Sequence, residues 1–175
     1  MAADTNKPDG NGAAQDSAAQ QTPQINVLGQ YVKDLSFENP KAPNSLREPG
    51  DNPNLNVEVN VNARRIEENI YESEIQFNAK TNSTLGDLYQ IELVYGGAFR
   101  LANFPEEALQ PVLLINCPSI LFPFLRRLVA DVTREGGFPP LLLDPIDFAG
   151  LYAKNRARAA DSEKEQDTPV ESGNV

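Results

Sequence analysis

Histidine and tryptophan are absent from this chain of 175 residues, and cysteine and methionine each occur once. Without histidine, a Ser-His-Asp or Cys-His nucleophile system cannot form, and neither can a metal site with histidine ligands. The single cysteine, Cys117, excludes an intrachain disulfide, and we interpret it as a small buried apolar residue. Glu72 and Glu74 share one strand face, but nothing around them indicates a cleft for acid–base chemistry. We therefore expect a protein without catalytic residues, metal ions or cofactors.

Basic residues are also scarce, with 15 Lys and Arg against 25 Asp and Glu, which gives a net charge of −10. Nucleic-acid binding needs a basic surface that follows the phosphates, so we expect no nucleic-acid partner. Anionic membrane surfaces are disfavoured for the same reason. Residues 1–24 and 154–175 carry net charges of −2 and −1, so −7 belongs to residues 25–153. The acidity is therefore a property of the central part of the chain.

Residues 1–24 contain no Val, Ile, Leu, Phe or Tyr. A secretory signal requires an apolar stretch, so we expect none here, and a single free thiol favours the reducing cytoplasm. Residues 108–125 carry no charge but include three prolines, at positions 111, 118 and 123. Because proline removes a backbone donor and bends a helix, we interpret this stretch as buried core or an oligomer interface rather than a membrane span.

The composition divides the chain into three parts. Residues 1–24 form a polar tail and residues 154–175 a charged tail, and neither has enough large apolar residues to offset the entropy cost of ordering. We expect both tails to be disordered, although the first turn or two of the second can extend a helix. Residues 25–153 form the single folded domain.

Apolar and polar residues alternate with a period of two in four segments, residues 25–38, 54–62, 70–80 and 88–95. Successive side chains of a strand point to opposite faces, so each segment has one apolar face and one polar, largely acidic face. This pattern is typical of an antiparallel sheet that is covered on one side. A long first connection followed by two short ones favours a Greek key. Glycines 96 and 97 are expected to end or bulge the fourth strand.

The second half of the chain changes to helical spacing. Residues 105–107 (PEE) indicate a helix start, and Pro111 and Pro118 are expected to limit that helix. A second helix is expected from Ser119, with the glycines at 136–137 as its stop.

A proline-stiffened apolar loop, residues 138–143, precedes a last helix that Asp144 or Asp147 can cap. Strands followed by helices predict an α+β fold. The apolar content of residues 108–132 exceeds what a small two-layer monomer can bury, so we expect self-association.

Four ordered blocks of sequence carry a family resemblance. They read YVKDLSFENP at residues 31–40, GGAF at 96–99, CPSILFPF at 117–124, and GFPPL followed by PIDF within 137–148. In order and spacing they resemble the SecB-type protein-export chaperones of bacteria, over about residues 25–153.

The resemblance implies a four-stranded antiparallel Greek-key sheet in the order 1-4-3-2 with two helices, assembled as a homotetramer that is a dimer of dimers. It implies an ATP-independent cytoplasmic chaperone that binds unfolded precursor proteins and delivers them to the SecA translocation motor, with no insertion into the membrane. The acidic positions of the family's SecA contact correspond to Asp34, Glu38 and Glu92. An apolar position of that contact corresponds here to Gln90, which is polar.

A chaperone of this kind would bind unfolded chain in an apolar groove. We expect the groove to be built by the loop 39–53, the apolar face of the second strand, the loop 138–143 and the last helix. The candidate client contacts are Val57, Val59, Phe138, Leu141, Leu143 and Phe148. Two alternatives remain at this point: a carrier of a small apolar ligand, or a related chaperone dedicated to one client such as an antitoxin.

Overall fold

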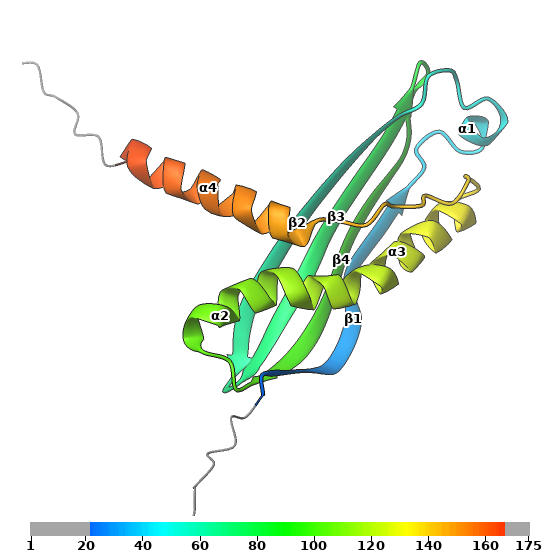
Figure 1. Ribbon diagram of the computed structural model, residues 1–175. Helices are drawn as coiled ribbons and strands as arrows, with labels where there is room; N and C mark the ends of the chain where they lie inside the picture. Colours follow the sequence, from blue (N-terminus) through cyan, green and yellow to red (C-terminus); the bar gives the residue numbers. More distant parts are fainter. Residues whose placement is uncertain (1–21, 167–175) are drawn as a thin grey trace, which may run out of the picture.

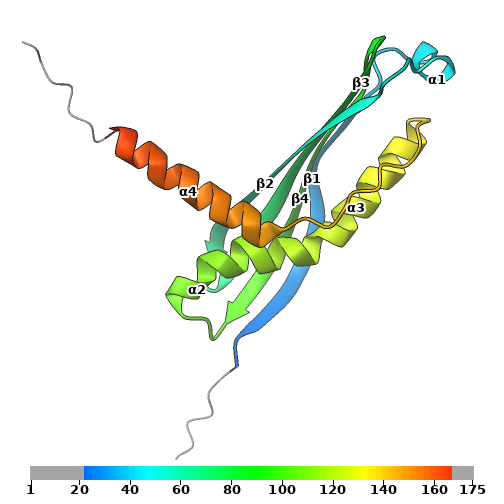
Figure 2. The ribbon, with the colours of Figure 1, turned by 45° about the horizontal axis from the view of Figure 1, so that its top comes forward.

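Within residues 22–166, the part of the chain that the computed structural model describes, four long strands form one antiparallel sheet (Figure 1). The strands are β1 (Gln24–Glu38), β2 (Asn54–Glu67), β3 (Ile70–Ser83) and β4 (Gly86–Ala102). Their spatial order is β1-β4-β3-β2, the order that the family resemblance implies. All helices that follow lie on one face of this sheet (Figures 1 and 2), which confirms the α+β prediction.

Two tight turns and one long connection join the strands. Asn69, with a φ of 58°, lies in the β2–β3 turn, and Gly86, with a φ of 98°, closes the β3–β4 turn. The long connection from β1 to β2 contains the short helix α1 (Asn44–Arg47). It lies at one end of the sheet and leads from the β1 edge to the β2 edge (Figure 1).

The prediction that glycines 96 and 97 end or bulge β4 is wrong. β4 continues to Ala102, and its pairing with β3 is regular through both glycines. A Cβ atom at Gly97 would lie 2.7 Å from a methyl group of Leu121. The glycine therefore allows a helix to approach the sheet closely, which is a requirement of packing and not of strand termination.

β1 departs from simple alternation because it contains two bulges against β4, one between Val27 and Gly29 and one between Val32 and Asp34. Each bulge inserts one residue and reverses which side chains face the helices. Tyr31, which the alternation assigns to the apolar face, consequently lies on the opposite, polar face, where its hydroxyl contacts Glu72. Val32 takes its place on the helix side, opposite Tyr95.

One continuous helical stretch crosses the sheet. It consists of α2 (Glu106–Pro111), the π-helical segment η1 (Val112–Asn116) and α3 (Cys117–Glu135). Pro111 limits α2, as expected, but neither proline interrupts the helical path, because the π-helical segment lies between them and leads directly into α3.

A serine from the sheet supports this unusual segment. In η1 the N–H of Cys117 donates to the Val112 carbonyl, so the Leu113 carbonyl would next need the N–H of residue 118. Pro118 has no N–H. The fully buried hydroxyl of Ser73, on β3, donates to the Leu113 carbonyl instead, at 2.8 Å. The helix can therefore pass Pro118 without leaving a buried carbonyl unpaired.

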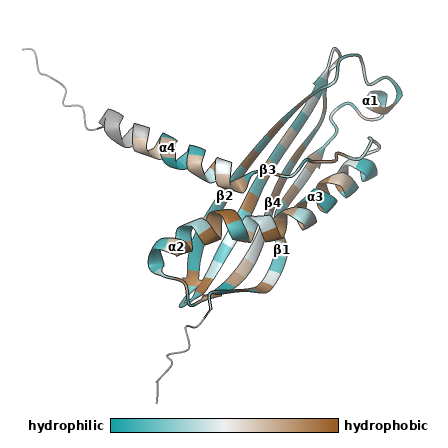
Figure 3. Cartoon of the chain, in the orientation of Figure 1, coloured by the Kyte–Doolittle hydropathy of each residue, from teal (hydrophilic) through white to brown (hydrophobic). Residues whose placement is uncertain are grey.

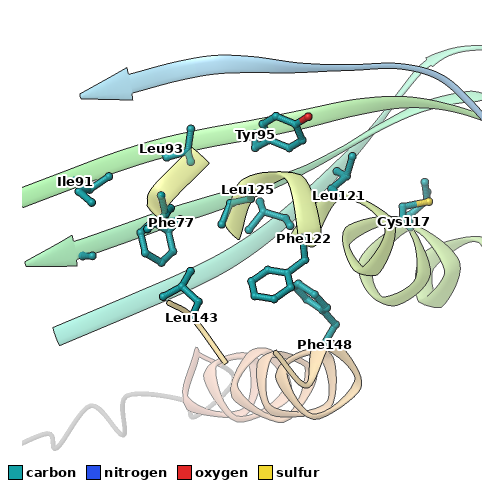
Figure 4. Packing of buried hydrophobic residues seen from close by; sticks show 14 of the residues in the cluster. Phe77, Ile91, Leu93, Tyr95, Cys117, Leu121, Phe122, Leu125, Leu143 and Phe148 are labelled. Carbon is teal, nitrogen blue, oxygen red and sulfur yellow. The ribbon is translucent and has the colours of Figure 1, made fainter. Parts of the chain in front are cut away.

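The core lies between the helical stretch and the sheet (Figure 4). α3 contributes a stripe at helical spacing that is fully shielded from solvent: Cys117, Leu121, Leu125 and Val129. The sheet contributes alternate residues of its two central strands: Ile75, Phe77, Ile91 and Leu93. The spacing of four residues on the helix and two on the strands is what places both sets at one interface.

Length and composition would allow the helical stretch Glu106–Glu135 to cross a membrane. In the fold, one side of this stretch packs on the sheet, and hydrophobic residues are concentrated in its middle (Figure 3). The other side leaves Phe124 43% exposed. The stretch is therefore a core helix that keeps an apolar outer face.

The chain leaves α3 where the sequence predicts. Gly136 follows the helix, and Gly137 has a φ of 86°. Residues 138–147 run back along α3 to the start of α4 (Phe148–Gln166), which leads away from the sheet in both views (Figures 1 and 2). Of the two candidate caps, Asp147 accepts the Gly150 N–H at 2.9 Å.

α4 also differs from the expected boundary after residue 153, since it continues to Gln166. Residues 153–160 are rich in alanine, arginine and lysine, which are good helix formers, so the helix extends beyond its packed part. Residues 1–21, most of the first expected tail, and residues 167–175, the end of the second, lie outside the described part of the chain.

Candidate functional site

The face of the sheet turned away from the helices is polar, and strand register arranges its residues in rows. One row runs Ser36, Glu92, Asn78 and Glu58 from β1 to β2. Side chains directly opposite one another lie about 4.5–5.5 Å apart at their Cβ atoms. Glu92 and Glu58 therefore belong to one surface, separated only by an asparagine.

The three predicted partner-binding residues lie on this same face. Asp34 and Glu38 are exposed on β1, two residues either side of Ser36, and Glu92 is exposed on β4 opposite Ser36. The bulges of β1 fall before Asp34, so the spacing of four residues keeps both carboxylates on one side. We call Asp34, Glu38, Glu92 and Glu58 the acidic face.

Glu58 was not among the predicted residues. The alternation of β2 indicated that it faces solvent, but only the register across β3 shows that it joins Glu92. A hollow of about 230 Å³ lies between the two, lined by Asn56, Glu58, Asn78, Ala79, Lys80, Gln90 and Glu92. Lys80, the cation of this hollow, is paired with Asp87 at 2.8 Å.

Gln90, which departs from the family pattern, has a defined role in this geometry. Its side-chain amide donates to a carboxylate oxygen of Glu92 at 2.8 Å. The polar substitution therefore orients one of the carboxylates of the acidic face and leaves its charge unchanged.

A second polar cluster lies on the same face, nearer the other end of β1. The carboxylate of Glu72 is 3% exposed and accepts hydrogen bonds from the Tyr31 hydroxyl at 2.7 Å, Arg64 Nε at 2.5 Å and Lys33 Nζ at 3.3 Å. Lys33 also contacts Glu74. These bonds tie β1 and β2 to β3, although the two outer strands do not touch each other.

The electrostatics of this cluster favour a charged Glu72. Burial by itself raises the pKa of the Glu72 carboxyl, but the hydrogen bonds from Tyr31, Arg64 and Lys33 outweigh it and leave the pKa lowered. A general acid or base needs a pKa near the working pH, so this carboxylate is not suited to proton transfer. Glu72 and Glu74 therefore do share a strand face, as expected, but as parts of an ion-pair network.

The opposite, helix-bearing side of the sheet holds the predicted client contacts. Val57 on the edge strand β2 is 39% exposed, and Val59 is half-buried beside it. In the loop 138–147, Phe138 and Leu141 are half-buried against the core. These four side chains are accessible and apolar.

Leu143 and Phe148 differ, because the fold buries them. Leu143 is 8% exposed and lies against the core near Phe77, and Phe148 is 4% exposed with its ring centroid 6.0 Å from that of Phe122 (Figure 4). In this conformation neither reaches the surface. They anchor the loop and the start of α4 in the core.

The exposed residue between Leu141 and Leu143 was not predicted. Leu142 is 68% exposed, and Leu46 of α1 and Leu55 of β2 are 45% and 42% exposed. Three consecutive leucines at 141–143 gave no basis for choosing which one faces solvent. The choice depends on how the loop is held against α3.

Two hollows line the margin between β2 and the helices. One, of about 470 Å³, involves β2, α2 and η1, and the other, of about 180 Å³, reaches α4. They share Val61, Gln110 and Leu114, so they adjoin along β2. The second-strand face and the last helix, both expected as groove walls, thus meet here, with Leu151 as an apolar contribution from α4.

The described residues, 22–166, offer no cluster of three or more His, Cys, Asp or Glu side chains that could hold a metal ion. Cys117 is fully buried, and burial raises the pKa of its thiol to about 12. The thiol is therefore protonated at neutral pH and unsuited to nucleophilic attack.

Comparison with known proteins matches residues 18–159 to the family model described as SecB, preprotein translocase subunit SecB. A protein-export protein SecB of Bradyrhizobium sp. strain BTAi1 is 49% identical over 160 residues, covering 91% of this chain and 98% of the relative. That of Azorhizobium caulinodans is 51% identical over 142 residues, covering 81% and 87%.

Among solved structures, a SecB-like chaperone of Mycobacterium tuberculosis in complex with a ChAD peptide from the HigA1 antitoxin has a similar fold. The TM-score is 0.59 at 16% sequence identity, covering 70% of this chain and 90% of that one. This likeness concerns the fold, a four-stranded antiparallel sheet with helices on one side.

Proposed function

Because this chain belongs to the SecB family of protein-export chaperones, we propose that it binds unfolded precursor proteins in the cytoplasm and delivers them to the SecA translocation motor. The proposal requires no ATP, cofactor or catalytic step. The observation that carries it is the contrast between the two faces of one sheet. One face is polar and bears exposed carboxylates, and the other is apolar and only partly covered.

The acidic face supports the assignment of the SecA contact to Asp34, Glu38 and Glu92, and we add Glu58. Exposed carboxylates contribute little to folding stability, about 0–1 kcal/mol for a surface pair. They do create a negative potential that attracts a basic partner and raises the rate of encounter. Gln90 orients Glu92 in this surface through the hydrogen bond described above.

The apolar side supports the assignment of client contacts to Val57, Val59, Phe138 and Leu141, to which we add Leu142. An unfolded client offers exposed apolar side chains, and burying them releases about 25 cal/mol per Å². Leu143 and Phe148 contribute from below by supporting these contacts. The adjoining hollows along β2 extend the apolar surface towards α4.

The proposed assembly is a homotetramer, a dimer of dimers. β1 leaves one edge unpaired among the described strands, and four of its apolar side chains are exposed: Val27, Leu28, Val32 and Leu35. Phe124 on the outer side of α3 is exposed as well. A second copy would cover both surfaces, because an unpaired edge and an apolar patch each favour association.

The function is tested by aggregation of a denatured protein. The chain is mixed with a substrate protein diluted from denaturant, in the absence of ATP, and light scattering is followed. A delay in aggregation at about one tetramer per substrate supports the proposal. Unchanged aggregation at a large excess of the chain would exclude a general chaperone and leave a single dedicated client or a small apolar ligand.

A further inference from the structure

The end of α3 and the loop that follows it are joined through one buried residue, Thr133. Its side chain is fully buried, and its hydroxyl lies 2.9 Å from the Val129 carbonyl and 3.0 Å from the Ala130 carbonyl. A hydroxyl can donate once and still accept. The acceptor side of the Thr133 hydroxyl receives the N–H of Leu141 at 2.9 Å.

The backbone of the same residue holds the beginning of the loop. The Phe138 N–H donates to the Thr133 carbonyl at 3.1 Å. Pro139 and Pro140 have no N–H, so the Leu141 amide is the next donor that the loop can offer. Thr133 therefore accepts hydrogen bonds from the N–H groups of Phe138 and Leu141, on either side of the proline pair, and fixes the position of the Leu141 backbone.

This attachment determines which leucine faces solvent. Leu141 is half-buried, Leu142 is 68% exposed and Leu143 is 8% exposed, an alternation typical of an extended segment. A shift of the loop by one residue would exchange the environments of Leu142 and Leu143. The loop is also held at Phe138, whose ring centroid lies 4.8 Å from that of Tyr89.

We propose that Thr133 is a positioning residue for client binding, one that presents Leu142 to the apolar segments of unfolded proteins by holding the Leu141 amide. The proposal rests on the client-binding function proposed above. A held loop offers its apolar side chain without the entropy cost of ordering on each binding event. Thr133 itself is buried and does not touch the client.

The test compares Thr133→Val, which removes the hydroxyl at nearly the same volume, with Thr133→Ser, which keeps it. Two quantities are measured at a temperature where all variants are folded: hydrogen exchange of the Leu141 amide, and affinity for a reduced, unfolded substrate protein. In Thr133→Val we expect the amide to exchange about fivefold faster, as for one lost neutral hydrogen bond, and the affinity to fall. Thr133→Ser should restore both.

Val129→Ala is the matched control for lost stability. It removes buried apolar volume one turn earlier on α3 but leaves the Thr133 hydroxyl in place. We expect it to lower the melting temperature while keeping the protection of the Leu141 amide and the affinity for the client. Equal losses of affinity in Val129→Ala and Thr133→Val at matched stability would overturn the positioning role.

The presentation of Leu142 is tested separately in chains with native Thr133. Cysteines introduced as Leu142→Cys and Leu143→Cys are labelled with a thiol reagent, and the buried Cys117 gives the background. Position 142 should react faster by at least about tenfold, as local protection of a buried site requires. Equal labelling, or an unchanged client affinity in Thr133→Val despite faster Leu141 exchange, would overturn the proposal.

The outcomes separate this inference from the proposed function. If the unaltered chain binds no unfolded protein, the function is wrong, although Leu141 exchange can still report on the attachment. If the unaltered chain binds and Thr133→Val binds equally well, only the role of Thr133 is wrong.

Discussion

Ser73 allows the sharpest test of how the helical stretch crosses its prolines. Ser73→Ala removes the hydroxyl that donates to the Leu113 carbonyl at 2.8 Å. The carbonyl is buried, and Pro118 cannot supply the missing donor. A buried polar group left without a partner costs about 1–3 kcal/mol. We therefore expect the free energy of unfolding to fall by about 2 kcal/mol.

The assay is thermal unfolding followed by circular dichroism at one fixed protein concentration, since assembly adds to the apparent stability. For a domain of this size, 1 kcal/mol corresponds to about 4 °C in Tm. The matched control is Ser119→Ala, which removes a hydroxyl that donates to the Ile115 carbonyl at an exposed position of the same helical stretch. Water can replace that bond, so the Tm should change by less than about 2 °C.

A double mutant tests the cause. In the Ser73→Ala chain, Pro118→Ala supplies a backbone N–H that can reach the Leu113 carbonyl, so it should recover part of the lost stability. In the unaltered chain Pro118→Ala should add less stability, because the Ser73 hydroxyl already donates to the Leu113 carbonyl. Equal melting temperatures for Ser73→Ala and Ser119→Ala would refute the reasoning.

Two further predictions concern the opposite faces of the sheet. The pKa of Glu72 is lowered in the folded chain, so its contribution to stability is present above the unfolded pKa of about 4.5 and is lost as pH falls through the lower folded value. The difference in free energy of unfolding between the unaltered chain and Glu72→Gln should therefore narrow below pH 4.5 in urea titrations. A difference that does not change with pH would contradict this. Leu142→Ser should weaken binding of an unfolded substrate protein by about tenfold, since burial of a leucine contributes about 1.5–3 kcal/mol. Leu143→Ser should instead lower the Tm measured by calorimetry. Weaker binding in Leu143→Ser and a lower Tm in Leu142→Ser would contradict the orientation of the loop.

The sequence predicts the regular parts of this fold well because each depends on neighbouring residues. Alternation places the four strands, Gly137 marks the end of α3, and one of the two candidate caps, Asp147, caps α4. The shared face of Asp34 and Glu38 follows from their spacing alone, since no bulge lies between them.

The wrong predictions arise where the local structure depends on residues far away in the sequence. Pro118 looks like a helix terminator until Ser73, on a strand 45 positions earlier, satisfies the Leu113 carbonyl. Tyr31 changes face because bulges depend on pairing with β4 and not on the composition of β1. Glu58 joins the acidic face only through the register of β3.

The central claim is that clients and the SecA motor use opposite faces of the same sheet, and one double substitution tests it most directly. Asp34→Lys with Glu38→Lys reverses two exposed charges of the acidic face and leaves the apolar side untouched. The measurement is the affinity for SecA at two salt concentrations, beside the delay of aggregation of a denatured protein. We predict that the double variant loses SecA binding but delays aggregation as well as the unaltered chain does. The affinity of the unaltered chain for SecA should fall as salt is added, because salt screens charges over about 8–10 Å. Undiminished SecA binding by the double variant would contradict the account.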